Sequence, residues 1–202
     1  MKTWKDKTTL GKINTVLLAL FSLTGVVMTI LYYINPEVYP KIGSYLVTII
    51  LPLLPRFLKL IRLELSDQMI FIALIFAILS MIFGIDFDFY KNWYIFGNPC
   101  YDKIAHILSG VVFAFVGKEI MLKFYPTGKE KKDYHRGFAT LFIIGFVALT
   151  AAGWECYEFL YDQITGGHMQ ELIAPGVADT MWDILGALGA GIITAFFISK
   201  KK

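Results

Sequence analysis

Long apolar runs constrain this chain more than any other feature of its sequence. Apolar residues make up 56% of the 202 residues and charged residues only 17%, so a water-soluble globule of this size would leave much of its apolar surface exposed. A membrane-spanning helix needs about 20 mostly apolar residues. Candidate runs lie near 13–34, 42–55, 68–85, 103–122, 138–160 and 181–199. The sequence therefore predicts an all-α, polytopic transmembrane helix bundle of about six spans.

The second run is the weakest of these candidates. It is short and carries Pro52 and Pro55, and proline kinks or breaks a helix. The first run follows a basic N-terminus without a cleavage-site pattern, which predicts a retained anchor. Because no connection between the runs is long enough for a soluble domain, we expect residues 1–202 to form a single membrane domain.

Lysine and arginine alternate in number along the connections between the runs. The N-terminus, the second and fourth connections and the C-terminus hold 16 of them, whereas the other connections hold 3. Since basic residues favour the cytoplasmic side, this pattern predicts that both termini are cytoplasmic. The net charge of +3 then reflects topology, and we expect a multi-pass protein of the cell membrane in contact with membrane lipids, with no nucleic-acid partner.

Three pairs of titratable residues stand at the predicted outer ends of the last three runs, each spaced to place both side chains on one helix face. The pairs are Asp102 and His106, Glu155 and Glu158, and Asp179 and Asp183. Consecutive helices joined by short loops are usually neighbours. We therefore expect the six side chains to form one polar cluster.

The two glutamates are the most informative members of this set. The aspartates could simply cap the N-termini of their helices, where the helix dipole favours negative charge. Glu155 and Glu158 instead end their run, where the dipole opposes negative charge, and an acid in a membrane span needs a partner. Cationic candidates on the outer side are few: Lys41, Lys91, Lys103, His106 and His168. Trp154 and Trp182, each beside an acid, are typical of an interfacial aromatic belt.

The order of these residues resembles a known family. The segments "YDKIAHILSG", "GWECYEF" and "DTMWDILGALGAG" are similar to the pattern of the YjdF-like family of uncharacterised bacterial membrane-spanning proteins, over roughly residues 80–198. A looser resemblance links the aspartate-lysine-x-x-histidine opening and the acidic, glycine-rich last run to VanZ-like proteins. The first resemblance implies a multi-pass helical membrane protein and no established reaction.

A metal site is the first interpretation of the six side chains. They would bind one divalent ion, because helices that face each other in a bundle can hold a metal between them. The candidate metal ligands are Asp102, His106, Glu155, Glu158, Asp179 and Asp183. The candidate catalytic residues, for hydrolysis or transfer on an envelope lipid or glycan, are Glu155, Glu158 and His106. A shared metal requires Glu155 to lie within about 10 Å of His106 or Asp183.

Two other interpretations remain open. The carboxylates could carry protons or bind a solute in a transport protein. Alternatively the cluster is structural, and Gly186, Gly189 and Gly191 allow close packing of the last helix. The sequence also leaves open a disulfide between Cys100 and Cys156.

The predicted topology can be tested with cysteine labels. Single cysteines placed in residues 126–134 or at the C-terminus should be protected from membrane-impermeant reagents in intact cells, because both are predicted to be cytoplasmic. Cysteines placed in residues 163–175 should react. Reaction within residues 126–134 would reverse the orientation and place the polar cluster on the cytoplasmic side.

Overall fold

The computed structural model describes residues 7–37, 41–87, 89–95, 98–124, 134–166, 169–170 and 177–199. These residues are mainly helical, with a pair of two-residue antiparallel strands, which confirms the predicted all-α class. The chain divides into two compact units, Met1–Asp88 and Phe89–Lys202. The single membrane domain stays a prediction.

In the first unit, a hydroxyl–carboxylate contact joins the starts of two long helices. The Thr8 side chain caps α1 (Thr9–Ile34) by accepting a hydrogen bond from the Gly11 amide at 2.9 Å. Its hydroxyl donates to Asp67 Oδ2 at 2.5 Å. Asp67 begins α4 (Asp67–Ala77), which continues into the wider helical turns of η3 (Ile78–Asp86). The two helices therefore begin at the same end of the unit.

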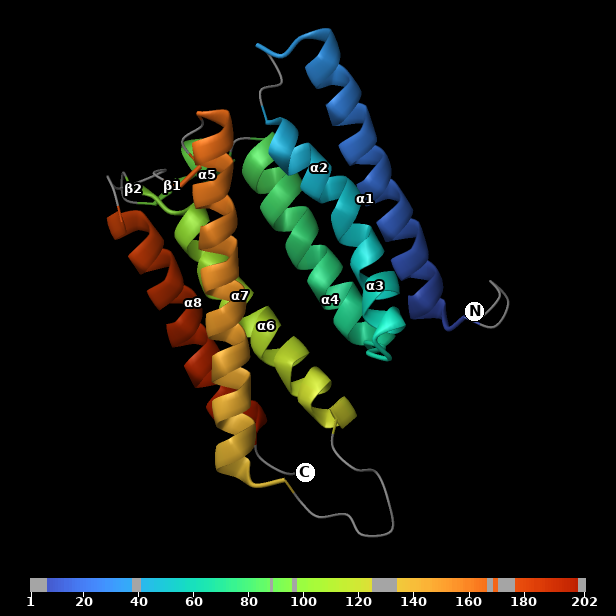
Figure 1. Cartoon of the computed structure of the whole chain (residues 1–202), viewed down its shortest axis with the longest axis vertical. Helices are drawn as coiled ribbons and strands as arrows, with labels where there is room; N and C mark the ends of the chain where they lie inside the picture. Colours follow the sequence, from blue (N-terminus) through green and yellow to red (C-terminus); the bar gives the residue numbers. More distant parts are fainter. Residues whose placement is uncertain are drawn as a thin grey trace. The chain divides into compact units, whose positions relative to one another are not determined.

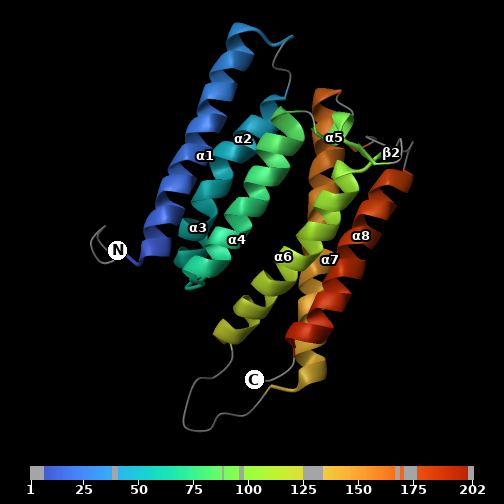
Figure 2. The same ribbon diagram turned by 180° about the vertical axis from the view of Figure 1, so that it is seen from behind.

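The second predicted run is helical but divided. It consists of α2 (Ile42–Ile50), the 3₁₀ turn η2 (Leu51–Leu53) and α3 (Leu54–Leu60), which follow one another without a gap. Both prolines fall in the first turn of a new piece, where a proline's missing N–H costs no helical hydrogen bond. The divided helix lies beside α1, and its first piece also contacts η3 (Figures 1 and 2).

The described residues contain five helices that are long and apolar enough to cross a membrane. They are Thr9–Ile34, Asp67–Asp86, Tyr101–Phe124, Arg136–Thr165 and Val177–Ile198. These helices correspond to every predicted run except the second. A sixth crossing by residues 42–60, and the cytoplasmic location of the termini, stay predictions.

In the second unit, three long helices pack against one another. A short helix, α5 (Phe89–Asn92), and the strands β1 (Tyr94–Ile95) and β2 (Asn98–Pro99) precede them. The long helices are α6 (Tyr101–Phe124), α7 (Arg136–Thr165) and α8 (Val177–Ile198), and they alternate in direction (Figure 2). The start of α6, the end of α7 and the start of α8 therefore meet at one end of the unit.

Small residues allow these helices to approach closely. A Cβ added to Gly110 of α6 would lie 2.1 Å from the carbonyl oxygen of Ala187 in α8. A Cβ on Gly191 would lie 2.7 Å from the Val147 side chain of α7. The close packing that the structural interpretation assigned to these glycines is therefore found at Gly191 but not at Gly189, where an added Cβ meets no described residue within 4 Å. At Gly186 an added Cβ would make only an ordinary contact, 3.5 Å from Ile107.

We predict that Gly110→Ala destabilises the protein, because the new methyl group would overlap rigid backbone of α8. Overpacking of this kind costs roughly 1–3 kcal/mol. The midpoint of thermal unfolding in detergent should fall for Gly110→Ala and stay nearly unchanged for the control Gly189→Ala. Equal midpoints for the two variants would show that α6 and α8 are not in backbone contact.

Candidate functional site

Polar side chains are buried together at the end of the second unit where α6, α7 and α8 meet. Each of the six predicted site residues exposes less than a tenth of its surface. They are Asp102 and His106 of α6, Glu155 and Glu158 of α7, and Asp179 and Asp183 of α8. Charged side chains are almost never buried without partners, so the contacts of each one matter.

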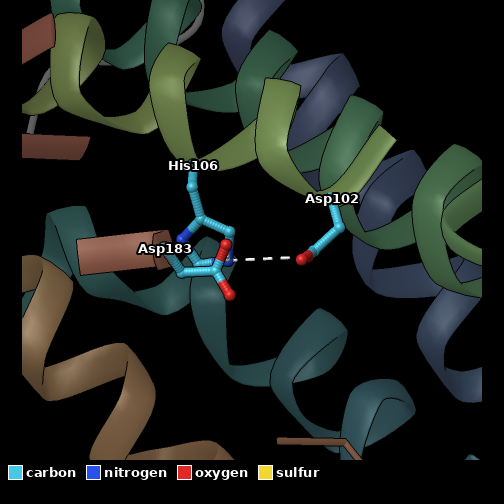
Figure 3. A group of neighbouring side chains, drawn as sticks. All are labelled: Asp102, His106 and Asp183. Atoms are coloured by element: carbon cyan, nitrogen blue, oxygen red, sulfur yellow. Dashed lines mark ion pairs between the residues drawn. The ribbon is translucent and has the colours of Figure 1, made fainter. Parts of the chain in front are cut away.

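His106 is surrounded by carboxylates. Its Nε2 atom lies 3.5 Å from Asp102 Oδ1, 3.8 Å from Asp183 Oδ1 and 4.0 Å from Glu155 Oε1. Figure 3 shows Asp102 one helical turn before His106 on α6, with Asp183 of α8 facing the ring. Glu155 is well inside the 10 Å limit that a shared metal requires. Three helices thus bring one imidazole nitrogen and three carboxylate oxygens together.

These separations suit a metal centre. With ligand bonds of roughly 2.1 Å, the donors around a tetrahedral ion stand about 3.4 Å apart, and wider angles bring this to about 4 Å. The nitrogen–oxygen distances around His106 fall in that range. Asp102, His106 and Asp183 alone offer donor atoms that all lie within 4.8 Å of one another. The described residues therefore contain a group that could hold a divalent ion.

Lys103 is the cationic partner in this cluster. Its Nζ atom donates to Asp102 Oδ2 at 3.2 Å, Asp179 Oδ1 at 2.5 Å and Asp183 Oδ1 at 2.6 Å. The sequence named Lys103 only as one of several possible counter-ions and left it out of the site. Its position beside Asp102 hid this role, because neighbouring residues on a helix point in different directions. The long, flexible lysine stem reaches across to α8.

Glu155 has no hydrogen bond to any of the described residues. Both of its carboxylate oxygens are buried, and neither accepts a hydrogen bond from the parts of the chain that the structure describes. The Thr180 hydroxyl lies nearby but lacks hydrogen-bond geometry. An unsatisfied buried acceptor costs about 1–3 kcal/mol and more when it is charged. Glu155 therefore faces the cluster as an acceptor that lacks a donor or a cation.

Glu158 is held differently from the other acids. Its Oε1 atom accepts a hydrogen bond from Trp154 Nε1 at 2.6 Å, one turn earlier on α7. Trp154, which the sequence analysis interpreted as an interfacial belt residue, therefore also donates a hydrogen bond to a buried acid. Trp182, in contrast, is 65% exposed, as a belt residue would be. The spacing of Trp154 and Glu158 at i and i+4 was the signal that could have identified this pair.

The other sequence candidates lie apart from this geometry. Cys100 and Cys156 are free thiols in the structure, so the disulfide left open by the sequence is not formed. His168 lies outside the described residues. Lys41 belongs to the first unit, where it donates to the carbonyl oxygen of Ile85.

Comparison with known proteins places the chain at the level of a family. A family model described as "Predicted membrane protein (DUF2238)" matches residues 14–202. No curated protein and no solved structure matches the chain.

We predict that Trp154→Phe lowers stability, because it leaves the buried Glu158 carboxylate without its donor. The loss should be about 1–3 kcal/mol. Trp182→Phe is the matched control, since this exposed ring also precedes an acid, and it should change the midpoint of thermal unfolding much less. If the two substitutions have the same effect, the Trp154–Glu158 hydrogen bond does not stabilise the fold.

Proposed function

This chain belongs to the DUF2238 family of predicted membrane proteins, and we propose that its buried carboxylate–histidine cluster binds a divalent metal ion. One observation carries the proposal. His106 Nε2 has carboxylate oxygens from three different helices within 4.0 Å. Acids brought so close together repel one another unless a cation or protons lie between them. A bound metal ion would stabilise this arrangement.

The proposed ligands are a subset of the six that the sequence suggested. They are Asp102, His106 and Asp183, whose donor atoms lie within 4.8 Å of one another, and Glu155, whose Oε1 atom lies 4.0 Å from His106 Nε2. Asp179 and Glu158 would instead support the site, because they are bound to Lys103 and Trp154. One imidazole with several carboxylates suits Mn²⁺, Fe²⁺ or Zn²⁺ better than Mg²⁺ or Ca²⁺.

The charges of the cluster support a cation further. Five carboxylates lie among one lysine and one histidine, so ionised acids would outnumber the positive groups even if His106 carried a proton. Uncompensated charge is costly where water is excluded. A divalent ion next to Glu155 would neutralise two of the excess negative charges.

The proposed reaction class is hydrolysis or transfer on an envelope lipid or glycan. A bound metal supplies Lewis acidity and a nucleophile at neutral pH. The cluster lies at one end of three helices that are long and apolar enough to span a membrane, where a lipid headgroup could reach it. Glu158, which is buried one turn from Glu155, could orient the reacting group as a proton acceptor. The extracytoplasmic location and the resemblance to YjdF-like proteins are part of this proposal.

A structural role is the second candidate, and Lys103 favours it. Its ammonium joins α6 to two aspartates of α8 and would hold the helices together without a metal. In that case Glu155 would be protonated and the cluster would have no ligand.

Elemental analysis of the purified protein separates these candidates. We expect about one divalent ion per chain in the wild type, because the donor atoms of Asp102, His106 and Asp183 lie within 4.8 Å of one another. Glu155→Gln should lower metal affinity about tenfold or more. The control Glu119→Gln removes a carboxylate from the same helix as His106, about 20 Å away along the axis, and should keep the ion.

A wild-type protein that binds no Mn²⁺, Fe²⁺ or Zn²⁺ even when each is added in excess would refute the metal proposal. The structural role of Lys103 would then account for the cluster.

A further inference from the structure

We propose that Lys103 acts as a built-in cation that fills a second cation position beside the metal, and thereby limits the cluster to one metal ion. This inference rests on the proposed metal site and adds a residue that determines how many ions it accepts. It is carried by the arrangement of oxygen atoms around the lysine ammonium.

Carboxylate oxygens surround the Lys103 ammonium. Three carboxylate oxygens lie 2.5–3.2 Å from Lys103 Nζ. Divalent cations bind carboxylate oxygens at about 2.0–2.6 Å, so small shifts of the same three oxygens would enclose a metal ion. The Lys103 side chain is only 27% exposed, and its aspartate partners are nearly inaccessible. The ammonium therefore occupies a buried, three-oxygen cation position.

The cation position at Lys103 shares two carboxylates with the candidate metal centre. Asp102 directs Oδ2 to Lys103 and Oδ1 to His106. Asp183 Oδ1 lies 2.6 Å from Lys103 Nζ and 3.8 Å from His106 Nε2. Bridging carboxylates of this kind hold the ions of two-metal sites, which stand about 3.5–4 Å apart. The cluster thus resembles a two-cation site in which one cation belongs to the chain.

The position at Lys103 and the position at His106 each have one acid that the other does not share. Asp179 contacts Lys103, whereas Glu155 contacts His106. Glu155 is also the buried acid that has no hydrogen bond among the described residues, so the position next to it is the one where we place the metal ion. Lys103 satisfies the other position with a single charge and without Lewis acidity. Removing its charge should allow the three aspartates to bind a second divalent ion.

The experiment counts metal ions in the full chain, purified in detergent and saturated with Mn²⁺ or, separately, Zn²⁺. We expect about one ion per chain in the wild type and about two in Lys103→Gln, since the variant exposes the three-oxygen position. Lys103→Arg keeps the positive charge and should keep about one ion. An unchanged count of one in Lys103→Gln, or a count of two in the wild type, would overturn the inference.

Two double variants assign the ions to their positions. Asp179→Asn added to Lys103→Gln should remove the ion at the lysine position and return the count to about one. Glu155→Gln added to Lys103→Gln should weaken binding of the ion at His106 and leave binding of the ion at the lysine position unchanged. If Lys103→Gln does not fold without metal, its thermal midpoint is measured after expression with added Mn²⁺. If Mn²⁺ neither raises the thermal midpoint of Lys103→Gln nor allows the variant to fold, the result counts against the inference.

These outcomes separate the inference from the proposed function. No ion in the wild type and one in Lys103→Gln would refute the native metal site but support Lys103 as a substitute for a cation. One ion in the wild type and none in Lys103→Gln would support the metal site and refute the inference, because Lys103 would then be needed to assemble the ligands.

Discussion

The second unit depends on one electrostatic constraint: an ionised side chain inside an apolar span must find its counter-charge within the protein. Lys103 meets this constraint for three aspartates at once, two of which lie on another helix. The contact is possible only because α6 and α8 begin at the same end and approach closely where Gly110 meets Ala187. Helix packing and the charge pairing therefore support each other, since a bulkier residue at 110 would move the aspartates away from the ammonium.

The same constraint separates the two glutamates. Glu158 accepts a hydrogen bond from Trp154, a donor on its own helix. Glu155 points to His106 and has no donor among the described residues. A protein under selection only for stability could replace such an acid with an apolar residue at little cost, because buried ion pairs are weak sources of stability. The unsatisfied acid therefore supports the proposed metal site.

Much of this architecture follows from local sequence patterns, and the exceptions have physical causes. The apolar runs predict the long helices, and the i, i+3 and i, i+4 pairs predict which acids share a face. Gly110 was missed because a helical glycine reveals a close approach only when the facing residue, here Ala187, is known. Lys103 was underestimated because a flexible stem can reach several neighbours, and only the positions of Asp179 and Asp183 decide among them. Tertiary packing supplied both answers.

A lysine ammonium and a metal ion can each neutralise buried carboxylates, and the cluster has a position that suits each of them. The aspartates at Lys103 are compensated by a charge that is always present and cannot dissociate from the chain. The acids at His106 could be compensated by protons or by a dissociable ion, and only such compensation can change with conditions. In the proposed metal site, the Lys103 ammonium would keep the shared carboxylates of Asp102 and Asp183 in place whether or not the second position holds an ion. Lys103 would thus preorganise the proposed ligands and lower the cost of ordering them when a metal ion binds.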